Sequence, residues 1–331
     1  MSDPNPFREW TRLEQRRLGT RVVVASDDFF APKERLIDSA EPVFIPDKYD
    51  DHGKWMDGWE SRRRRDGGHD YCIIRLGLPG VIRGVDIDTS HFTGNFPPAA
   101  SIDACESDAE LPGADVAWEV LLPEVGLHGD AHHFLPVKSG QRYTHLRLNI
   151  FPDGGVARLR VYGEVIPDWS RTAADDIVDL LAVENGGRAI ACSDEHFGSM
   201  HNLNVAGRAA NMGDGWESAR RRGPGNDWVI VALGRPGIIE QVEIDTAHFK
   251  GNYPDRASLQ AAMVGSAGNI VKKSEKWPLL LPEYRLEADK QQIIASDLQD
   301  VGVVSHARLN IIPDGGISRL RLFGRIDTER E

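Results

Sequence analysis

Short segments in which apolar and polar residues alternate run along most of the chain, separated by turns rich in glycine and proline. The segment "VIRGVDIDT" (81–89) alternates in this way, and "RVVVAS" (21–26) and "YCIIRLG" (71–77) are rich in β-branched residues. A period of two residues is typical of half-buried strands, and turn residues between such segments favour antiparallel connections. The sequence contains no series of strands alternating with long helical patterns. The pattern therefore predicts an all-β fold.

The tetrapeptide "PDGG" occurs at 152–155 and again at 313–316, beside alternating segments such as "THLRLNIF" (144–151) and "SRLRLFG" (318–324). A proline, an aspartate and two glycines are typical of a tight turn, so we expect a hairpin between the strands that flank each tetrapeptide. Arg147, Arg158 and Arg160 alternate along these strands. We expect them to line a solvated face of the sheet.

The chain carries an internal duplication. "HLRLNIFPDGGVARLRVYG" (145–163) recurs as "HARLNIIPDGGISRLRLFG" (306–324), with 13 of 19 positions identical. "RLGLPGVIRGVDIDTSHFTGNFP" (75–97) recurs as "ALGRPGIIEQVEIDTAHFKGNYP" (232–254), and the offset between equivalent positions changes along the chain from 167 to 157 to 161 residues. Each copy is long enough to hold its own core, so the repeat predicts two tandem domains rather than a solenoid.

We therefore predict two tandem jelly-roll β-sandwich domains that arose by internal duplication. The expected boundaries are an N-terminal extension at 1–20, a first repeat at 21–165, a linker at 166–178 and a second repeat at 179–327. The segment "IPDWSRTAADDIVDLL" (166–181) is acidic and partly helical in pattern, and is interpreted as a linker or a docking helix.

Charge and composition exclude several classes of function. The chain has 331 residues and a formal net charge of −12, whereas nucleic-acid binding needs a segregated basic surface. Its three cysteines have no CxxC spacing, which argues against a disulfide framework. The chain has no long uncharged apolar run and no apolar leader segment. We expect a cytoplasmic protein that binds neither nucleic acid nor membrane.

One candidate site is the pair of segments "DGWESRRRR" (57–65) and "DGWESARRR" (214–222). In a structural interpretation, Trp59 caps the core and Glu60 pairs with Arg63 or Arg64. In a functional interpretation, a guanidinium binds a carboxylate or ureido oxygen while the neighbouring carboxylate transfers protons.

Histidines provide further candidates. "SHFTGNFP" (90–97) and "AHFKGNYP" (247–254) each place a histidine after a strand, followed by an asparagine in a glycine turn. "HGDAHHF" (128–134) has no histidine counterpart in the second copy. His128 and His132, four residues apart, would suit a metal ion if the segment were helical, but its glycine and nearby prolines favour a loop.

Taken together, "GKWMDGWESRRRR", "DIDTSHFTGNFP" and "THLRLNIFPDGGVARLRVYG" resemble the allantoicase (allantoate amidinohydrolase) family, which itself consists of two tandem copies of this repeat. The resemblance covers almost the whole chain. It implies galactose-binding-like jelly rolls, a homo-oligomer, and hydrolysis of allantoate to ureidoglycolate and urea in allantoin and purine catabolism. The alternative is a non-catalytic tandem jelly-roll protein that binds a small molecule or carbohydrate.

Allantoate carries one carboxylate and two ureido groups, so its hydrolysis requires a cation, hydrogen-bonding groups, an acid and a base. We expect Glu60, His133 and His91 to be catalytic, and Trp59, Arg63, Arg64 and Asn95 to bind substrate. Their second-repeat equivalents are Glu217, Arg220, Arg221, His248 and Asn252. We expect no cofactor and assign no metal ligand, although metal dependence is left open. The extra histidines favour the first repeat as the site of chemistry, and an interface site is left open.

Overall fold

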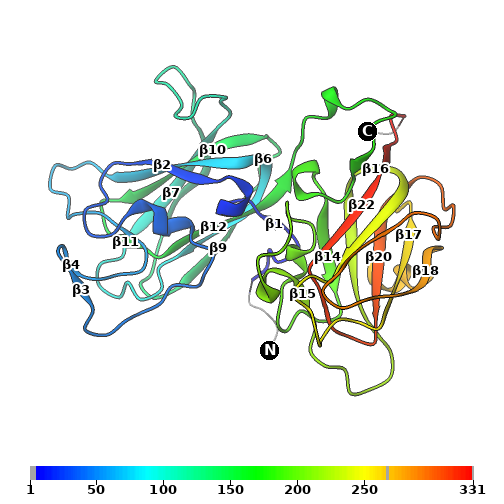
Figure 1. Cartoon of the computed structure of the whole chain (residues 1–331). Coiled ribbons are helices and arrows are strands. Elements are labelled where there is room, and N and C mark those ends of the chain that lie inside the picture. Colours follow the sequence, from blue (N-terminus) through cyan, green and yellow to red (C-terminus); the bar gives the residue numbers. More distant parts are fainter. Residues whose placement is uncertain (1–4, 266–267, 330–331) are drawn as a thin grey trace. The chain divides into compact units, whose positions relative to one another are not determined.

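The computed structural model describes residues 5–265 and 268–329 and consists of two compact units, which divide between Ile166 and Pro167 (Figure 1). Both units are built from antiparallel strands with a few short helical turns. The predicted all-β fold of two tandem jelly-roll sandwiches is confirmed.

The elements of the first unit are β1 (Thr11–Arg12), η1 (Arg16–Leu18), β2 (Arg21–Ala25), η2 (Lys33–Ile37), β3 (Tyr49–Asp50), β4 (Gly53–Lys54), β5 (Trp59–Glu60), β6 (Asp70–Asp88), β7 (Ala99–Cys105), β8 (Glu119–Gly126), β9 (His132–Pro136), β10 (Tyr143–Phe151), β11 (Gly155–Val156) and β12 (Arg158–Val165).

The elements of the second unit are η3 (Trp169–Arg171), β13 (Val178–Asp179), η4 (Val183–Asn185), β14 (Arg188–Cys192), η5 (Met200–Asn202), η6 (Met212–Asp214), β15 (Trp216–Glu217), β16 (Asp227–Asp245), β17 (Arg256–Ala262), α1 (Ile270–Ser274), β18 (Leu279–Arg285), β19 (Gln291–Ile294), β20 (Val304–Ile312), β21 (Gly316–Ile317) and β22 (Arg319–Ile326).

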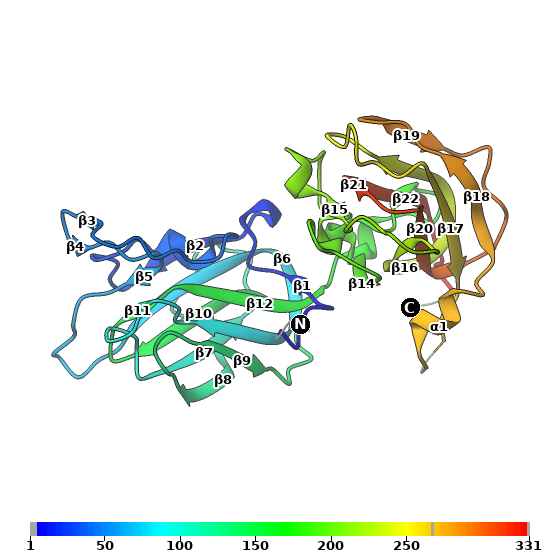
Figure 2. The same ribbon diagram turned by 90° about the horizontal axis from the view of Figure 1, so that it is seen from below.

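The long strand β6 connects the two layers of the first sandwich (Figure 2). Its first half pairs with β2 and β10, and β10 continues to β7 and β8; its second half pairs with β9 and β12, and β12 continues to β1. The sequence predicts two strands here, broken at Pro79–Gly80. The strand instead continues through these residues because its partner changes there, from β10 to β12. In the second unit β16 has the same role.

The N-terminal residues before β2 contribute to the first sandwich. β1 pairs with β12, and Leu13 is fully buried. In the second unit β13 pairs with β22 in the same way, and Leu180 is fully buried. No helix among the described residues is both long and apolar enough to cross a membrane.

The expected PDGG hairpin is wrong. β10 and β12 are not paired with each other: β10 lies beside β6 and β7, and β12 lies beside β6 and β1. The PDGG segment instead connects the two layers, and β11, which begins at its last glycine, pairs with β5. The tetrapeptide is thus a crossing between layers, which local turn composition does not distinguish from a hairpin.

The expectation that arginines on these strands face solvent is also wrong for Arg158 and Arg160, whose exposed fractions are 1% and 3%. The Arg158 guanidinium donates to Ala40 O, Asp57 O and Asp57 Oδ2, with distances of 2.9–3.0 Å. Arg160 donates to the carbonyls of Asp38 and Ala40. Both side chains therefore hold segment 38–57 onto the sheet.

Replacing Arg158 by methionine is expected to lower the free energy of unfolding of the first unit by about 3–5 kcal/mol, because Asp57 and two carbonyls lose a buried cationic partner. Urea unfolding followed by intrinsic fluorescence measures this change. Arg83→Met is the matched control, since Arg83 forms a half-exposed ion pair with Glu164 and should cost less than about 1 kcal/mol. Equal losses in the two variants would contradict the role assigned to Arg158.

Candidate active site

Three segments that are far apart in the sequence meet beside β5. Asp70 N, at the start of β6, donates to Pro152 O, and Ser61 N donates to Gly154 O. Gly155 N donates to Asn95 O at 2.7 Å. A Cβ on Gly154 would lie 2.8 Å from Asn95 O, and its φ is +135°, so this close approach requires glycine. The DGWES, HFTGN and PDGG motifs thus form one assembly.

Glu60 lies at the centre of this assembly. Its Oε1 accepts a hydrogen bond of 2.7 Å from Asn95 Nδ2. Burial of the carboxyl raises the pKa of Glu60 above its ordinary value, and the Asn95 hydrogen bond offsets only part of that effect. The pairing of Glu60 with Arg63 or Arg64, one of the two interpretations of this loop, is not found among the described residues, and the side-chain partner of Glu60 is an amide. A carboxyl group that is not paired with a cation retains its proton to higher pH, which suits proton transfer.

Glu60 and Asn95 line two adjacent pockets, which are called here the two lobes of the cavity. One lobe, of about 420 Å³, is lined by Glu60, Asn95, Arg63 and part of the PDGG segment. The other lobe, of about 570 Å³, is lined by Glu60, Asn95, His91, Phe44 and Lys54. Phe30 and Gly94 also line both lobes. The carboxyl of Glu60 can therefore be reached from either lobe.

The second lobe is built in part by an insertion that the second repeat lacks. Between Glu41 and Asp57 the offset to the second repeat falls from 167 to 157 residues, so the first repeat carries ten additional residues. They include the two-stranded β3–β4 ribbon, which brings His52 and Lys54 to the cavity. Lys54 Nζ lies 4.6 Å from the ring centroid of Phe44. The insertion thus adds a cation and an aromatic wall.

Arg63 and Arg64 both line the first lobe but differ in their partners. Arg64 Nε binds Asp66 and Arg64 Nη1 binds Asp70, each at 2.7 Å, and its backbone N–H donates to Asp153. None of the described residues forms a hydrogen bond or ion pair with the Arg63 side chain. Arg63 is therefore the guanidinium available to an anionic ligand, whereas Arg64 is engaged in holding the loop.

Trp59 and His91 occupy different environments. Trp59 is fully buried, and its Nε1–H donates to Asp27 O at 2.8 Å, so the ring is fixed in the core and is not among the residues that line either lobe. His91 lines the second lobe with a backbone φ of +69°. Its backbone N–H donates to Asp130, and its Nε2 lies 3.2 Å from Pro42 O.

His133 does not join Glu60. It lies on β9 and is not among the residues that line either lobe. Its Nδ1 is 2.7 Å from Ile87 O, and its Nε2 accepts the backbone N–H of His128 at 2.9 Å. Both ring nitrogens are therefore in contact with backbone groups, which fixes the orientation of the ring at the β9 edge.

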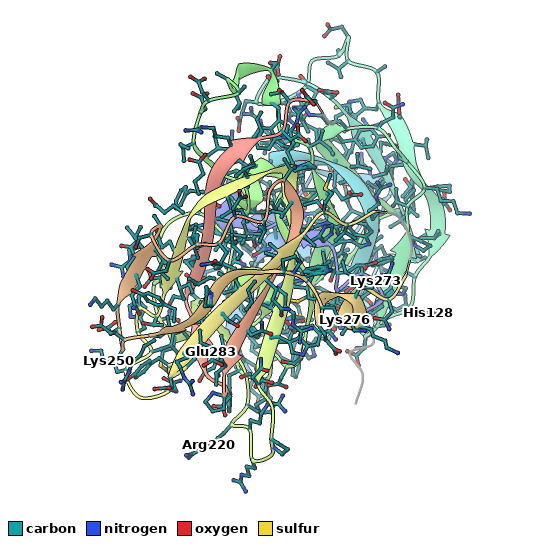
Figure 3. The ribbon with its side chains drawn as sticks, turned by 90° about the vertical axis from the view of Figure 1, so that its right-hand side faces the viewer. His128, Arg220, Lys250, Lys273, Lys276 and Glu283 are labelled. Carbon is teal, nitrogen blue, oxygen red and sulfur yellow. The ribbon has the colours of Figure 1, made fainter. Side chains whose placement is uncertain are left out.

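The second repeat retains much of the same framework. Asn252 Nδ2 donates to Glu217 Oε1, and Trp216 is fully buried with its Nε1–H on Asp194 O. Arg221 pairs with Asp227, as Arg64 pairs with Asp70. His248 has a φ of +70°, and its Nε2 lies 2.8 Å from Ala209 O. Arg220 is exposed on a loop that projects from the second sandwich (Figure 3).

Sequence reasoning missed several residues of the cavity. Phe30, Phe44, His52 and Lys54 were not singled out, although all four line the second lobe. For Phe44, His52 and Lys54 the change in repeat offset was the available signal, because an insertion in one copy beside shared polar motifs indicates a feature specific to that copy. Phe30 lies before the insertion and corresponds to Phe197 in the second repeat.

Among the described residues, the side chains close enough together to hold a metal ion are Glu41, Asp88 and His132. None of the three lines the cavity that contains Glu60. His128, which would join His132 as a ligand only if their segment were helical, does not belong to this group.

Comparison with known proteins identifies both repeats. The family profile described as "Allantoicase repeat" matches residues 11–166 and 178–327. The chain is 57% identical over 98% of its length to a protein named "Probable allantoicase 2" from Burkholderia pseudomallei (strain K96243), and covers 98% of that protein. It is 55% identical over 96% of its length to "Probable allantoicase" from Pseudomonas aeruginosa (strain UCBPP-PA14), and covers 97% of that protein. The crystal structure of allantoicase from Saccharomyces cerevisiae superposes with a TM-score of 0.80 at 35% identity, covering 95% of this chain and 92% of that one.

Replacing Glu60 by glutamine is expected to raise the unfolding temperature at pH 7–8. Because the pKa of Glu60 is raised in the folded protein, this group contributes its full stability to the fold below the ordinary glutamate pKa of about 4.3. That contribution is lost as pH rises through the folded-state pKa, where the carboxyl becomes charged. Glutamine can still accept from Asn95 but carries no charge, so the difference between the proteins should vanish near pH 4. Thermal unfolding from pH 4 to 8 tests this, with exposed Glu124→Gln as the control. A lower unfolding temperature for Glu60→Gln at pH 8 would contradict the burial argument.

Proposed function

The chain belongs to the allantoicase family, and we propose that it hydrolyses allantoate to ureidoglycolate and urea at the cavity of the first repeat. The observation that carries the reaction is the match of both repeats to allantoicases over nearly the full length. The observation that carries the site is the partly buried Glu60 carboxyl, which lines both lobes and shares one of them with Arg63, a guanidinium with which none of the described residues pairs. A cytoplasmic location and a homo-oligomer stay predictions.

In this proposal Arg63 binds the carboxylate of allantoate. A guanidinium forms two parallel hydrogen bonds with a carboxylate, and Arg63 has none of its donors engaged by the described residues. Lys54, His52 and His91 surround the other lobe, where they can contact the ureido oxygens. Asn95 directs Oε1 of Glu60 through its amide and leaves Oε2 to face the substrate.

Glu60 is proposed as both the acid and the base. Its protonated form gives a proton to the ureido nitrogen on the central carbon, the C–N bond breaks, and urea departs with that proton. The lone pair of the remaining ureido nitrogen stabilises the electron-deficient carbon. Water then adds to this carbon and gives a proton to the Glu60 carboxylate, which forms ureidoglycolate and restores the acid. The raised pKa increases the protonated fraction available for the first step.

The geometry supports different roles for three residues that the sequence analysis places in the reaction. We propose that Trp59 and Arg64 hold the loop, because one is fully buried and the other is engaged by two aspartates. We propose that His133 is structural, because the backbone occupies both ring nitrogens.

The matched pair Glu60→Gln and Glu217→Gln tests the assignment to the first repeat. Glu60→Gln should lower kcat for urea release at least about 100-fold, the usual scale for loss of an acid or base. Glu217→Gln should change kcat by less than about threefold, since the second repeat lacks the insertion. A steady-state urea assay with both folded variants decides between them. A larger loss in Glu217→Gln would move the site to the second repeat, and a wild type that binds allantoate without releasing urea would support the binding-protein alternative.

Replacing Arg63 by methionine should raise KM for allantoate about 10- to 100-fold and affect kcat less, because the guanidinium binds a carboxylate that takes no part in bond breaking. A charge-assisted hydrogen bond contributes about 1.5–3 kcal/mol, which corresponds to this range. Arg220→Met is the equivalent change in the second repeat and should leave KM unaltered. A fall in kcat at constant KM would show that Arg63 acts on the transition state instead.

A further inference from the structure

The two repeats differ in charge at one equivalent position on the sandwich. Glu41 in the first repeat corresponds to Arg208 in the second, 167 residues later. The equivalence is structural as well as sequential: Arg158 Nε donates to Ala40 O and Arg319 Nε donates to Gly207 O. One repeat therefore has a carboxylate where the other has a guanidinium.

In the second repeat this guanidinium neutralises a buried carboxylate. Arg208 Nε lies 3.1 Å from Asp245 Oδ2, and Arg208 Nη2 lies 3.3 Å from Asp245 Oδ1. Asp245 is fully buried and also accepts the Ala247 N–H. Its neighbour Glu243 accepts a hydrogen bond of 2.7 Å from Gln291 Nε2. Each buried carboxylate in this repeat thus has a polar side-chain partner.

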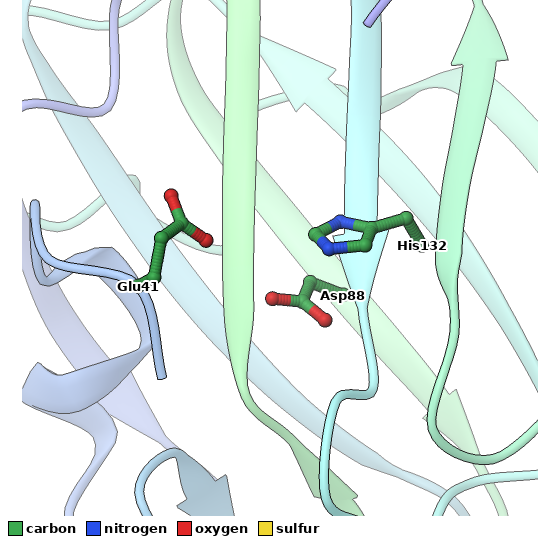
Figure 4. A group of neighbouring side chains, drawn as sticks. All are labelled: Glu41, Asp88 and His132. Atoms are coloured by element: carbon green, nitrogen blue, oxygen red, sulfur yellow. The ribbon is translucent and has the colours of Figure 1, made fainter. Parts of the chain in front are cut away.

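In the first repeat the equivalent carboxylate, Asp88, has no such partner. Asp88 is 1% exposed, and its Oδ1 accepts the Ser90 N–H at 2.8 Å. Its Oδ2 is buried without a hydrogen bond from any described residue. The carboxylate lies between Glu41 and His132, and ligand atoms of these three side chains are all within 4.8 Å of one another (Figure 4). An unpaired buried carboxylate facing a second carboxylate is costly unless a cation lies between them.

His132 presents a suitable ligand atom. Its Nδ1 lies 2.7 Å from Asp86 Oδ2, so Nε2 is the ring nitrogen left for a ligand. Metal-binding histidines commonly direct their other ring nitrogen to a carboxylate, which fixes the ring and increases its basicity. The second repeat has Gln291 at this position, and an amide is a poor ligand for transition metals.

The nearby cations do not replace Arg208. Arg160 Nη2 lies 3.7 Å from Glu41 Oε1, but Arg160 is also 4.0 Å from Glu14 and donates to backbone carbonyls. Its equivalent Arg321 is present in the second repeat as well, so it does not offset the change from Arg208 to Glu41. Arg158 is paired with Asp57.

From this arrangement we infer that Glu41, Asp88 and His132 bind a divalent transition-metal ion, which does in the first repeat what Arg208 does in the second. The exchange of a guanidinium for a carboxylate makes the local charge more negative by two units. A divalent cation offsets this change. Two carboxylates and an imidazole suit Zn²⁺ or Mn²⁺. Zinc lies about 2.0–2.2 Å from such ligands, so the exposed Glu41 and His132 side chains need to approach by about 1 Å.

The site fixes the segment that leads into the cavity. Pro42 follows Glu41, and its carbonyl lies 3.2 Å from His91 Nε2. Phe44 lies in the same segment and lines the cavity. The ion is therefore structural: it joins segment 38–44 to β6 and β9, and it does not contact the proposed substrate.

Binding of Zn²⁺ and Mn²⁺ to the full-length chain, freed of any histidine tag and treated with chelator, provides the test. We expect one ion per chain by calorimetry and elemental analysis. At about 100 times Kd the ion should raise the unfolding temperature of the first unit by about 5–10 °C. Glu41→Arg, which copies the second repeat, should weaken binding at least about 100-fold while retaining the fold, because the new guanidinium pairs with Asp88. Glu41→Gln should weaken binding without supplying a replacement cation, so its unfolding temperature should fall below that of Glu41→Arg.

The reciprocal variant gives an independent result. Replacing Arg208 by glutamate and Gln291 by histidine should create a second binding site, so the variant should take up two ions per chain. The inference would be overturned if the wild-type chain takes up no ion, in which case protonated His132 is the cation of the cluster. It would also be overturned if Glu41→Arg binds the ion as tightly as the wild type. Because binding and unfolding are the readouts, these outcomes do not depend on the proposed reaction.

Discussion

The buried guanidinium of Arg158 is the interaction on which the functional end of the first sandwich depends. It satisfies two carbonyls and the Asp57 carboxylate, and these groups belong to the long segment between η2 and β5. Without a buried cation, this irregular segment would leave carbonyl oxygens unpaired inside the protein. Arg319 forms the equivalent contacts with Gly207 and Asp214 in the second repeat. A buried arginine therefore anchors the equivalent segment in both repeats, although this segment is ten residues longer in the first repeat.

Once the segment is anchored at both ends, its middle can vary at little cost to the fold. The first repeat uses this freedom for the β3–β4 ribbon, which brings Phe44 and Lys54 to the cavity beside Glu60. It also changes Arg208 to Glu41 next to a buried aspartate. Both differences lie between the two segment ends that Arg158 contacts in the first repeat and Arg319 contacts in the second. The two repeats have therefore diverged where the backbone is least constrained by strand pairing.

Glu60 illustrates how such a framework raises a pKa. The side chain follows a fully buried tryptophan on β5 and is hydrogen-bonded by Asn95 of the HFTGN turn, and its partial burial raises the pKa of the carboxyl. Its nearest polar partner is an amide, which orients the group without neutralising it. Two arginines of the same loop are directed elsewhere: Arg62 to Asp27 and Arg64 to Asp66 and Asp70. These acidic partners keep guanidinium groups from pairing with Glu60, which would lower its pKa.

The sequence by itself determined the all-β class, the duplication and the motifs that meet at the cavity, because residue periodicity and repetition are local properties. It also indicated Glu60, Asn95, His91 and Arg63, which the fold brings to one cavity.

Only the tertiary structure decided which polar groups pair. Sequence alternation places Arg158 and Arg160 on a strand face, but it does not reveal that the segment after η2 covers that face and buries them. It shows histidines at 132 and 133, but the pairing of β9 with β6 gives the ring nitrogens of His133 to the backbone and places His132 beside Asp88 and Glu41. Such partners come from elements far apart in the chain, and their distances follow from packing rather than from spacing.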